Sequence, residues 1–205
     1  KSKARNKVVD LIWFPTGGGK TEAYLSVAAF TIIYRRLMNE TGYDGTSVIM
    51  RYTLRLLTAQ QFERASRLIV SLEFLRTQFE EELKEEPITI GMWVGRSSTP
   101  NIIDDPKYGE GAVQKVEEIN EECNKKDGNP ESKNVFQISS CSWCGTKLMT
   151  KNELNNWTFG FKLEGNNQNR ELKIKCVNKN CHFHNDLPIQ VVDEMLYEKP
   201  PTLLF

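Results

Sequence analysis

The pattern of apolar and polar positions along this 205-residue chain predicts strands and helices in turn over its first hundred residues. Three short apolar runs typical of buried parallel strands lie at 8–14, 47–50 and 88–94. Between them, residues 22–36 are apolar at helical spacing, and Thr58 with Gln61 forms a capping box that is expected to open a long second helix. This order of elements predicts an α/β fold in which helices flank a parallel sheet.

The pattern changes in the second half of the chain, where a polar stretch with one weak helical repeat around Val116 precedes a cysteine cluster and a return to apolar runs. We therefore predict that residues 1–103 form the front of a sheet domain and that 104–134 are a polar insert or linker. Residues 135–187 are expected to form a small inserted cysteine subdomain, and 188–205 to return to the sheet domain. The last run, 202–205, reads as the beginning of a strand, so the sheet domain is expected to be truncated there.

A glycine-rich turn separates the first predicted strand from the first predicted helix, in the run Phe14-Pro-Thr-Gly-Gly-Gly-Lys-Thr21. Consecutive glycines allow backbone angles that turn several N–H groups toward one anion, and the helix N-terminus adds its positive end. In such a P-loop, the Lys20 ammonium would reach the β/γ-phosphates of ATP and the Thr21 hydroxyl would bind Mg²⁺. The full pattern has a glycine where this chain has Phe14, so the alternative is a glycine-rich turn with an accidental Lys-Thr.

We predict that this loop binds a nucleoside triphosphate, with Lys20 and Thr21 as the catalytic residues. The residues expected to hold the nucleotide are Pro15, Thr16, Gly17, Gly18, Gly19, Lys20, Thr21 and Glu22.

Two short-spaced cysteine pairs, Cys141 with Cys144 and Cys176 with Cys181, have the spacing at which a tight turn points two thiolates at one metal ion. Four thiolates would close a structural zinc site and leave no open position for a reacting water. Closing the loop between the pairs costs about 3 kcal/mol plus a constant. Zinc–thiolate binding contributes roughly 10–16 kcal/mol at neutral pH, so metal binding is the predicted outcome.

Other interpretations of the cysteines remain open in the sequence. The thiols could form two disulfides or stay unligated, although no secretory signal favours this. His182 or His184 could replace Cys181 as the fourth ligand. Cys123 has no partner at ligand spacing and is expected to be inert.

Two segments resemble motifs I and Ia of superfamily 2 helicases, namely Asp10–Leu25 and Met50–Phe62. Three more bring the resemblance closest to the helicases of the bacterial DISARM anti-phage system, namely Gly91–Gly95, Cys141–Gly145 and Leu187–Glu194. In those helicases a cysteine ribbon interrupts the first RecA-like domain. The resemblance spans most of the chain and is least informative over 104–134. It implies an ATP-driven motor on DNA with Mg²⁺ and structural Zn²⁺ as cofactors and with partner proteins of a defence system.

The resemblance also implies that motif Ia and the loop after the third strand contact the nucleic-acid backbone. The matching positions are Arg51, Thr53, Arg55, Gln61, Gly95 and Arg96. Guanidinium groups suit phosphate contacts that carry no sequence information. The alternatives are surface charges flanking a strand end for Arg51 and Arg55, and an ordinary turn at Gly95 and Arg96.

The carboxylate pair by which such helicases hold Mg²⁺ and orient the attacking water has a candidate in Asp193 and Glu194. Gln190 interrupts the apolar run before this pair, and the resembling helicases place theirs after a further strand. We therefore expect the pair beyond the chain end and favour surface acids for Asp193 and Glu194. The second RecA-like domain and its arginine finger are also missing, so the chain alone is expected to hydrolyse little ATP.

Composition narrows the function classes only slightly. Lys plus Arg and Asp plus Glu both number 27, so a nucleic-acid role would depend on local placement of basic groups. The sequence has neither an apolar stretch of bilayer length nor a signal-type N-terminus, so we expect a cytoplasmic location and no membrane partner. Two other functions stay open: a P-loop ATPase switch without nucleic acid, and a zinc-ribbon interaction module on a nucleotide-binding scaffold.

Overall fold

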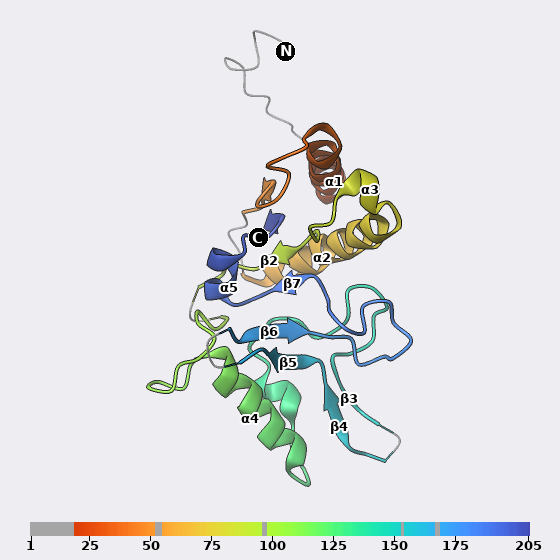
Figure 1. Cartoon of the computed structure of the whole chain (residues 1–205). Coiled ribbons are helices and arrows are strands. Elements are labelled where there is room, and N and C mark those ends of the chain that lie inside the picture. Colours follow the sequence, from red (N-terminus) through yellow and green to blue (C-terminus); the bar gives the residue numbers. More distant parts are fainter. Residues whose placement is uncertain (1–18, 52–54, 96–97, 153, 167–168) are drawn as a thin grey trace.

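The computed structural model describes residues 19–51, 55–95, 98–152, 154–166 and 169–205 (Figure 1). Its helices are α1 Lys20–Met38, α2 Arg55–Gln78, α3 Glu80–Leu83, α4 Ala112–Asn124 and α5 Asp193–Glu198, with a short 3₁₀ helix, η1 Pro130–Lys133. Its strands are β1 Val48–Ile49, β2 Ile90–Gly91, β3 Met149–Lys151, β4 Trp157–Phe159, β5 Phe161–Glu164, β6 Glu171–Ile174, β7 Ile189–Gln190 and β8 Leu203–Leu204.

A four-stranded parallel sheet in the order β1-β8-β2-β7 is the centre of one lobe, which we call the sheet lobe (residues 19–95 and 188–205). Ile90 of β2 pairs with Ile189 on one side and with Leu203 on the other, so β8 from the end of the chain lies between β1 and β2. The α/β fold with a helix-flanked parallel sheet is thereby confirmed. The first predicted strand, at 8–14, lies outside the described residues.

A buried arginine joins α1 to the segment that runs from α3 into β2. Arg36 of α1 is 1% exposed, and its guanidinium donates to the carbonyls of Leu83, Glu86 and Pro87 at 2.8, 2.6 and 3.2 Å. These carbonyls belong to the segment that leads into β2, so a single side chain fixes that segment against α1. The long second helix begins at Arg55, three residues before the predicted cap, because Arg55 and the two leucines after it are good helix formers. Thr58 therefore lies inside α2, and the capping-box prediction was wrong.

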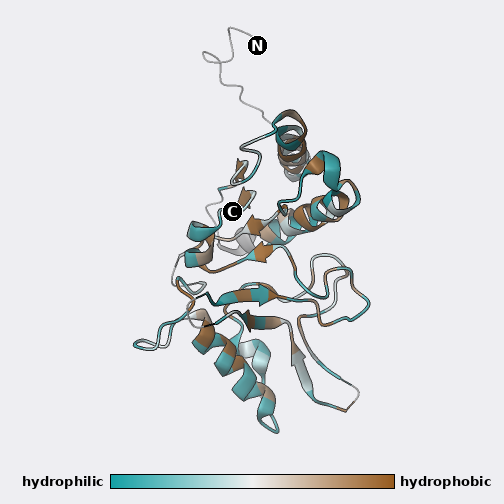
Figure 2. Ribbon diagram, viewed as in Figure 1, coloured by the Kyte–Doolittle hydropathy of each residue, from teal (hydrophilic) through white to brown (hydrophobic). Residues whose placement is uncertain are grey.

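Residues 101–187 form a second lobe that we call the cysteine lobe. It contains two antiparallel pairs, β3–β4 and β5–β6, and α4 packs its buried apolar residues against them. Gly160 joins β4 to β5, and a Cβ there would lie 2.1 Å from the Lys175 carbonyl oxygen, so only glycine fits. Figure 2 shows apolar residues concentrated in β2, β7 and β8, while much of the α4 ribbon has the colour of hydrophilic residues.

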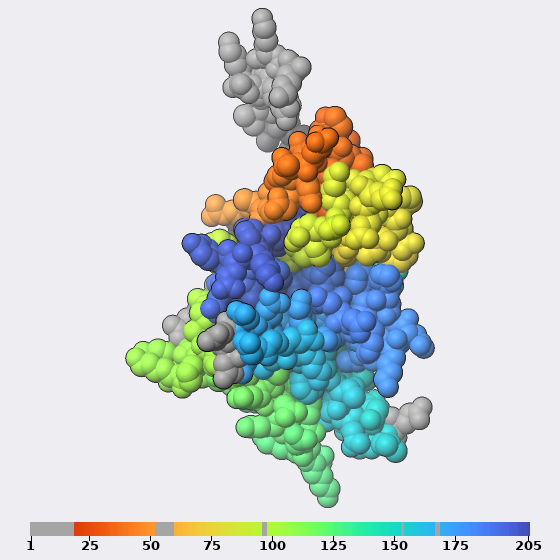
Figure 3. Space-filling model, viewed as in Figure 1, coloured from red at the N-terminus to blue at the C-terminus, as the bar shows by residue number. Residues whose placement is uncertain are grey.

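The end of the chain belongs to the sheet lobe and contacts the cysteine lobe through α5. In the space-filling view, residues of the dark blue C-terminal segment fill the region between the N-terminal helices and the cysteine lobe (Figure 3). The buried apolar residues of both lobes form one continuous core. Among the residues that the structure describes, every helix is too short or too polar to cross a lipid bilayer.

Candidate functional site

The two cysteine turns are closed by their own backbone hydrogen bonds. In the first turn, the Gly145 N–H donates to the Cys141 carbonyl at 2.9 Å, and Gly145 has a φ of 75°, which favours glycine. In the second turn, the Cys181 N–H donates to the Asn178 carbonyl at 3.0 Å. Each turn therefore holds two thiols on the same side of a tight loop, as the spacing predicts.

The four thiols converge on one point. The sulfur atoms of Cys141, Cys144, Cys176 and Cys181 all lie within 4.8 Å of one another. The closest contacts are 3.8 Å between Cys141 and Cys181 and 3.5 Å between Cys144 and Cys176. A tetrahedral zinc ion with Zn–S bonds of about 2.3 Å requires sulfur atoms about 3.8 Å apart, so these residues fit zinc. The separations exceed the roughly 2 Å of an S–S bond, and all four cysteines are free, so the disulfide alternative does not hold.

The thiols differ in their affinity for protons. Burial raises the pKa of Cys181 to about 11 and raises that of Cys176 as well. Burial also opposes ionisation of Cys144, but hydrogen bonding to the side chain and backbone of Thr146 lowers the pKa of this thiol to about 6. Three of the four cysteines are buried, which is typical of a structural centre with no open coordination position.

The two histidines beside the second turn have other partners. His184 Nδ1 lies 2.7 Å from the Cys176 carbonyl oxygen. The His182 ring packs against the rings of Phe74 and Phe183 at 4.9 and 4.8 Å. Since Cys181 completes the cluster, no histidine is needed as a ligand. Cys123 lies half-buried on α4, outside the cluster, and burial raises the pKa of its thiol.

The predicted nucleotide loop is described only at its end. Gly19 is the residue before α1 and has a φ of 77°, and Lys20 and Thr21 are the first two residues of the helix. Their N–H groups belong to the first helical turn, which has no acceptor inside the helix. Lys20 is exposed, while the Glu22 carboxylate forms an ion pair with Arg64 of α2. Pro15, Thr16, Gly17 and Gly18 lie outside the described residues.

Two of the residues predicted to contact nucleic acid follow strands that end at the same edge of the sheet. Because β1 and β2 are parallel, the segments that follow them, at Arg51 and Gly95, emerge from the same edge. Arg51 is exposed, and Gly95 has a φ of 82° in a turn where the Ser98 N–H donates to its carbonyl at 3.0 Å. The side chain of Gln61 on α2 is half-buried. Arg55 is the first residue of α2, whereas Thr53 and Arg96 lie outside the described residues.

The structure adds one residue at this edge that sequence reasoning missed. Trp93 follows β2 and is 62% exposed, although Ile90 and Met92 just before it are buried. The sequence carried only a weak signal for it, namely a large aromatic residue on the more polar side of an alternating run.

Asp193 and Glu194 begin α5 directly after the buried residues Val191 and Val192. The Glu194 carboxylate accepts a hydrogen bond from the Ile103 N–H at 2.6 Å, which ties α5 to the start of the cysteine lobe. Burial raises the pKa of Asp193, and hydrogen bonding to the Trp93 side chain opposes this rise. The Glu194 carboxylate therefore has a structural partner in the described chain.

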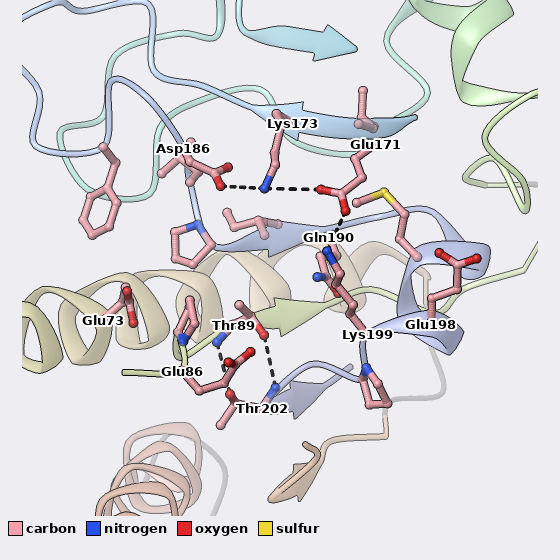
Figure 4. A pocket seen from close by; sticks show the side chains of 18 of the residues that line it. Glu73, Glu86, Thr89, Glu171, Lys173, Asp186, Gln190, Glu198, Lys199 and Thr202 are labelled. Carbon is pink, nitrogen blue, oxygen red and sulfur yellow. Dashed lines mark hydrogen bonds and ion pairs between the residues drawn. The ribbon is translucent and has the colours of Figure 1, made fainter. Parts of the chain in front are cut away.

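A cavity of about 340 Å³ lies between the two lobes (Figure 4). Along one wall, Lys173 pairs with Asp186 at 2.9 Å and with Glu171 at 3.7 Å, and Lys199 pairs with Glu171 at 2.6 Å. On the opposite wall, Thr89 and Thr202 each donate a backbone N–H to the hydroxyl of the other, at 3.2 and 3.3 Å. The ion pairs connect β6 to the residue after α5, and the threonine bonds connect the segments that lead into β2 and β8. Lys173, Lys199, Glu171 and Asp186 therefore pair among themselves.

Fold and site together define an α/β protein with a parallel sheet and a lobe built around four cysteines that are compatible with structural zinc. No protein-family model matches the chain. The chain is 38% identical over 210 aligned residues to the DISARM protein DrmA of Bacillus paralicheniformis. That alignment covers the whole of this chain and 17% of DrmA, so the chain is related to part of a DISARM protein and spans less than a fifth of its length.

Proposed function

We propose that this chain is the ATP-binding and DNA-contacting front part of a superfamily 2 helicase or translocase that serves in bacterial anti-phage defence. The observation that carries the proposal is the sequence Gly19-Lys20-Thr21 at the start of α1. Gly19 has a left-handed backbone conformation, and the Lys20 ammonium and the Thr21 hydroxyl follow it in the first helical turn. Support also comes from the parallel sheet and from the 38% sequence identity to a DISARM protein, which extends over the whole of this chain.

In this proposal, the first-turn N–H groups of α1 and the Lys20 ammonium bind the phosphates of ATP. Thr21 offers its hydroxyl to Mg²⁺, which would supply charge neutralisation between phosphate oxygens. Glu22 stays close to the phosphates through its position in the same turn, and its ion pair with Arg64 ties the head of α1 to α2. Nucleotide binding at α1 is thereby linked to the helix that follows the proposed DNA contacts.

DNA would lie along the edge where Arg51 and Gly95 emerge. Arg51 is exposed there, and Gly95 has a φ of 82° at the same edge. Such contacts recognise the sugar-phosphate backbone and not the base sequence. Zinc would hold the cysteine lobe in shape and take no part in ATP hydrolysis, since four sulfur ligands leave no free position.

The test uses the full-length protein with ATP hydrolysis measured in the presence and absence of DNA. Lys20→Ala is expected to abolish turnover, because it removes the charge that stabilises the transferring phosphoryl group. Lys126→Ala, an exposed lysine after α4, is the matched control and should hydrolyse ATP normally. Arg51→Ala should weaken DNA binding and lower its salt dependence by about one phosphate contact. Equal hydrolysis rates with and without DNA would argue for an ATPase switch instead of a motor.

A further inference from the structure

A second hollow lies on the cysteine lobe, where β4 and β5 meet the second cysteine turn. Its volume is about 360 Å³, within the range of small-ligand pockets. We call it the ribbon hollow and define it by the side chains that give it its chemistry, namely Trp157, Phe159, Lys162, Lys175, His184 and Asn185. None of the described residues that line it is acidic.

Two lysines contact the aromatic rings of this hollow: Lys162 lines the hollow, and Lys151 lies outside its lining but contacts the Trp157 ring. The Lys162 Nζ lies 4.2 Å from the centre of the Phe159 ring, and the Lys151 Nζ lies 5.1 Å from the centre of the Trp157 ring. Within the described chain, the neighbouring lysines have acidic partners: Lys175 pairs with Glu164 at 2.5 Å, and Lys173 pairs with Asp186. The same ion pairs include neither Lys162 nor Lys151, so both ammonium groups remain available to an external anion.

The position of Lys162 is unfavourable for the stability of the β5–β6 strand pair. It lies directly opposite Lys173 in the β5–β6 pair, and like charges opposite one another destabilise antiparallel strands. Lys162 is exposed, while Trp157 and Phe159 are half-buried and point to the same side of β4. Fixed rings with ammonium groups beside them are the features of surfaces on which bases stack while lysines contact the phosphates.

We propose that the ribbon hollow binds one or two nucleotides of a single-stranded nucleic acid, with the rings of Trp157 and Phe159 facing bases and with Lys162 and Lys151 facing phosphates. This inference rests on the proposed function and adds to it the strand form of the nucleic acid, because only an unpaired base can offer its face to these rings. The rings favour nucleotides over an acidic peptide, which would need the ammonium groups alone. Figure 1 shows β3 and β4 at the end of the cysteine lobe remote from β1, so this is a separate contact from the one at Arg51.

The experiment measures binding of a labelled oligothymidine of about ten nucleotides to the full-length protein without ATP, by fluorescence anisotropy over a range of salt concentrations. Trp157→Ala should weaken binding about fivefold to a hundredfold, and Trp157→Phe should retain most of it. Lys162→Ala should weaken binding and reduce the slope of log K against log salt by about 0.7. Lys107→Ala is the matched control, because its ammonium lies 4.7 Å above the Tyr108 ring away from the hollow. Unchanged zinc content and circular dichroism show that each variant is folded.

The proposal is overturned if Lys162→Ala and Lys107→Ala bind the oligonucleotide equally, or if Trp157→Ala binds as well as Trp157→Phe. It is also overturned if polyglutamate competes as well as oligothymidine at equal charge, which would identify an acidic peptide site. The proposed function fails separately. If DNA does not stimulate ATP hydrolysis but Lys162→Ala still weakens oligonucleotide binding, the motor proposal is wrong and the ribbon-hollow proposal is retained. If DNA stimulates hydrolysis through Arg51 and Lys162→Ala has no effect, the hollow alone is wrong.

Discussion

The ring of Phe74 on α2 lies 4.8 Å from the ring of Trp143, which stands between the two cysteines of the first turn. His182 and Phe183 follow the second turn, and the Phe183 ring lies 5.6 Å from that of Trp143. Both turns of the cysteine cluster therefore contact one helix of the sheet lobe. Since α2 begins at Arg55, the same helix connects the cysteine centre to the proposed DNA contacts.

Replacing Phe74 with alanine should loosen this junction. Phe74 is half-buried and contacts two rings, so we expect a loss of about 1–3 kcal/mol in the free energy of unfolding, with zinc still bound. Chemical denaturation with elemental analysis measures both. Phe30→Ala is the matched control: Phe30 also stacks on a ring, Tyr34 at 5.5 Å, but is 67% exposed and should cost far less. Equal losses for the two variants would show that the Phe74 contact is not special.

Removing one thiol should remove the metal. Cys141→Ser leaves three cysteines in the cluster, and we expect zinc loss with local unfolding of residues 135–187, because a zinc ion held by the four thiolates would join the two cysteine turns. Zinc content and limited proteolysis check the two effects. Cys123→Ser changes a cysteine outside the cluster and should keep a full zinc content. Protein purified without chelator that contains no zinc would refute the metal site.

Arg36 should be among the most sensitive positions of the sheet lobe. Arg36→Ala leaves the carbonyls of Leu83, Glu86 and Pro87 without this donor, and we expect a loss of about 2–4 kcal/mol in unfolding free energy. Arg36→Lys should recover only part of it, since an ammonium lacks the planar fork. Arg67→Ala breaks an exposed ion pair with Glu63 on α2 and should cost less than about 1 kcal/mol. Thermal unfolding of the three variants ranks them, and a small effect at Arg36 would contradict its role.

The ion pair between Glu171 and Lys199 should make a small part of the stability depend on pH. Hydrogen bonding from Lys199 holds the pKa of Glu171 below its ordinary value of 4.5. A depressed carboxyl pKa contributes stability that is present above the unfolded-state pKa and is lost as the pH falls through the folded-state pKa. Glu171→Gln should therefore be less stable than the parent protein at pH 7, by less than about 1 kcal/mol, and the two should converge as the pH falls through the folded-state pKa of Glu171, which lies below 4.5. Denaturation midpoints of the two proteins, measured from pH 7 into acid, test this pH dependence. A stability difference that persists in acid would exclude the ion pair as its cause.

Much of the local structure follows from the sequence because its determinants are local. The apolar runs at 47–50 and 88–94 contain β1 and β2, and the glycine before Lys20 is where α1 begins. The two cysteine turns depend on spacing within four to six residues, which is enough to aim each pair of thiols. Thr58 misled the prediction of α2, because the residues before it continue the helix just as well.

The sequence by itself determined an α/β chain with a glycine-rich turn before a helix and two metal-spaced cysteine pairs, since periodicity and spacing act over a few residues. Only the tertiary structure decided that β8 lies between β1 and β2 and that Phe74 meets Trp143. It also decided that Lys162 and Trp157 border one hollow. Each of these contacts joins residues far apart in the chain or in separate strands, and depends on which buried surfaces fit together once the whole core has formed.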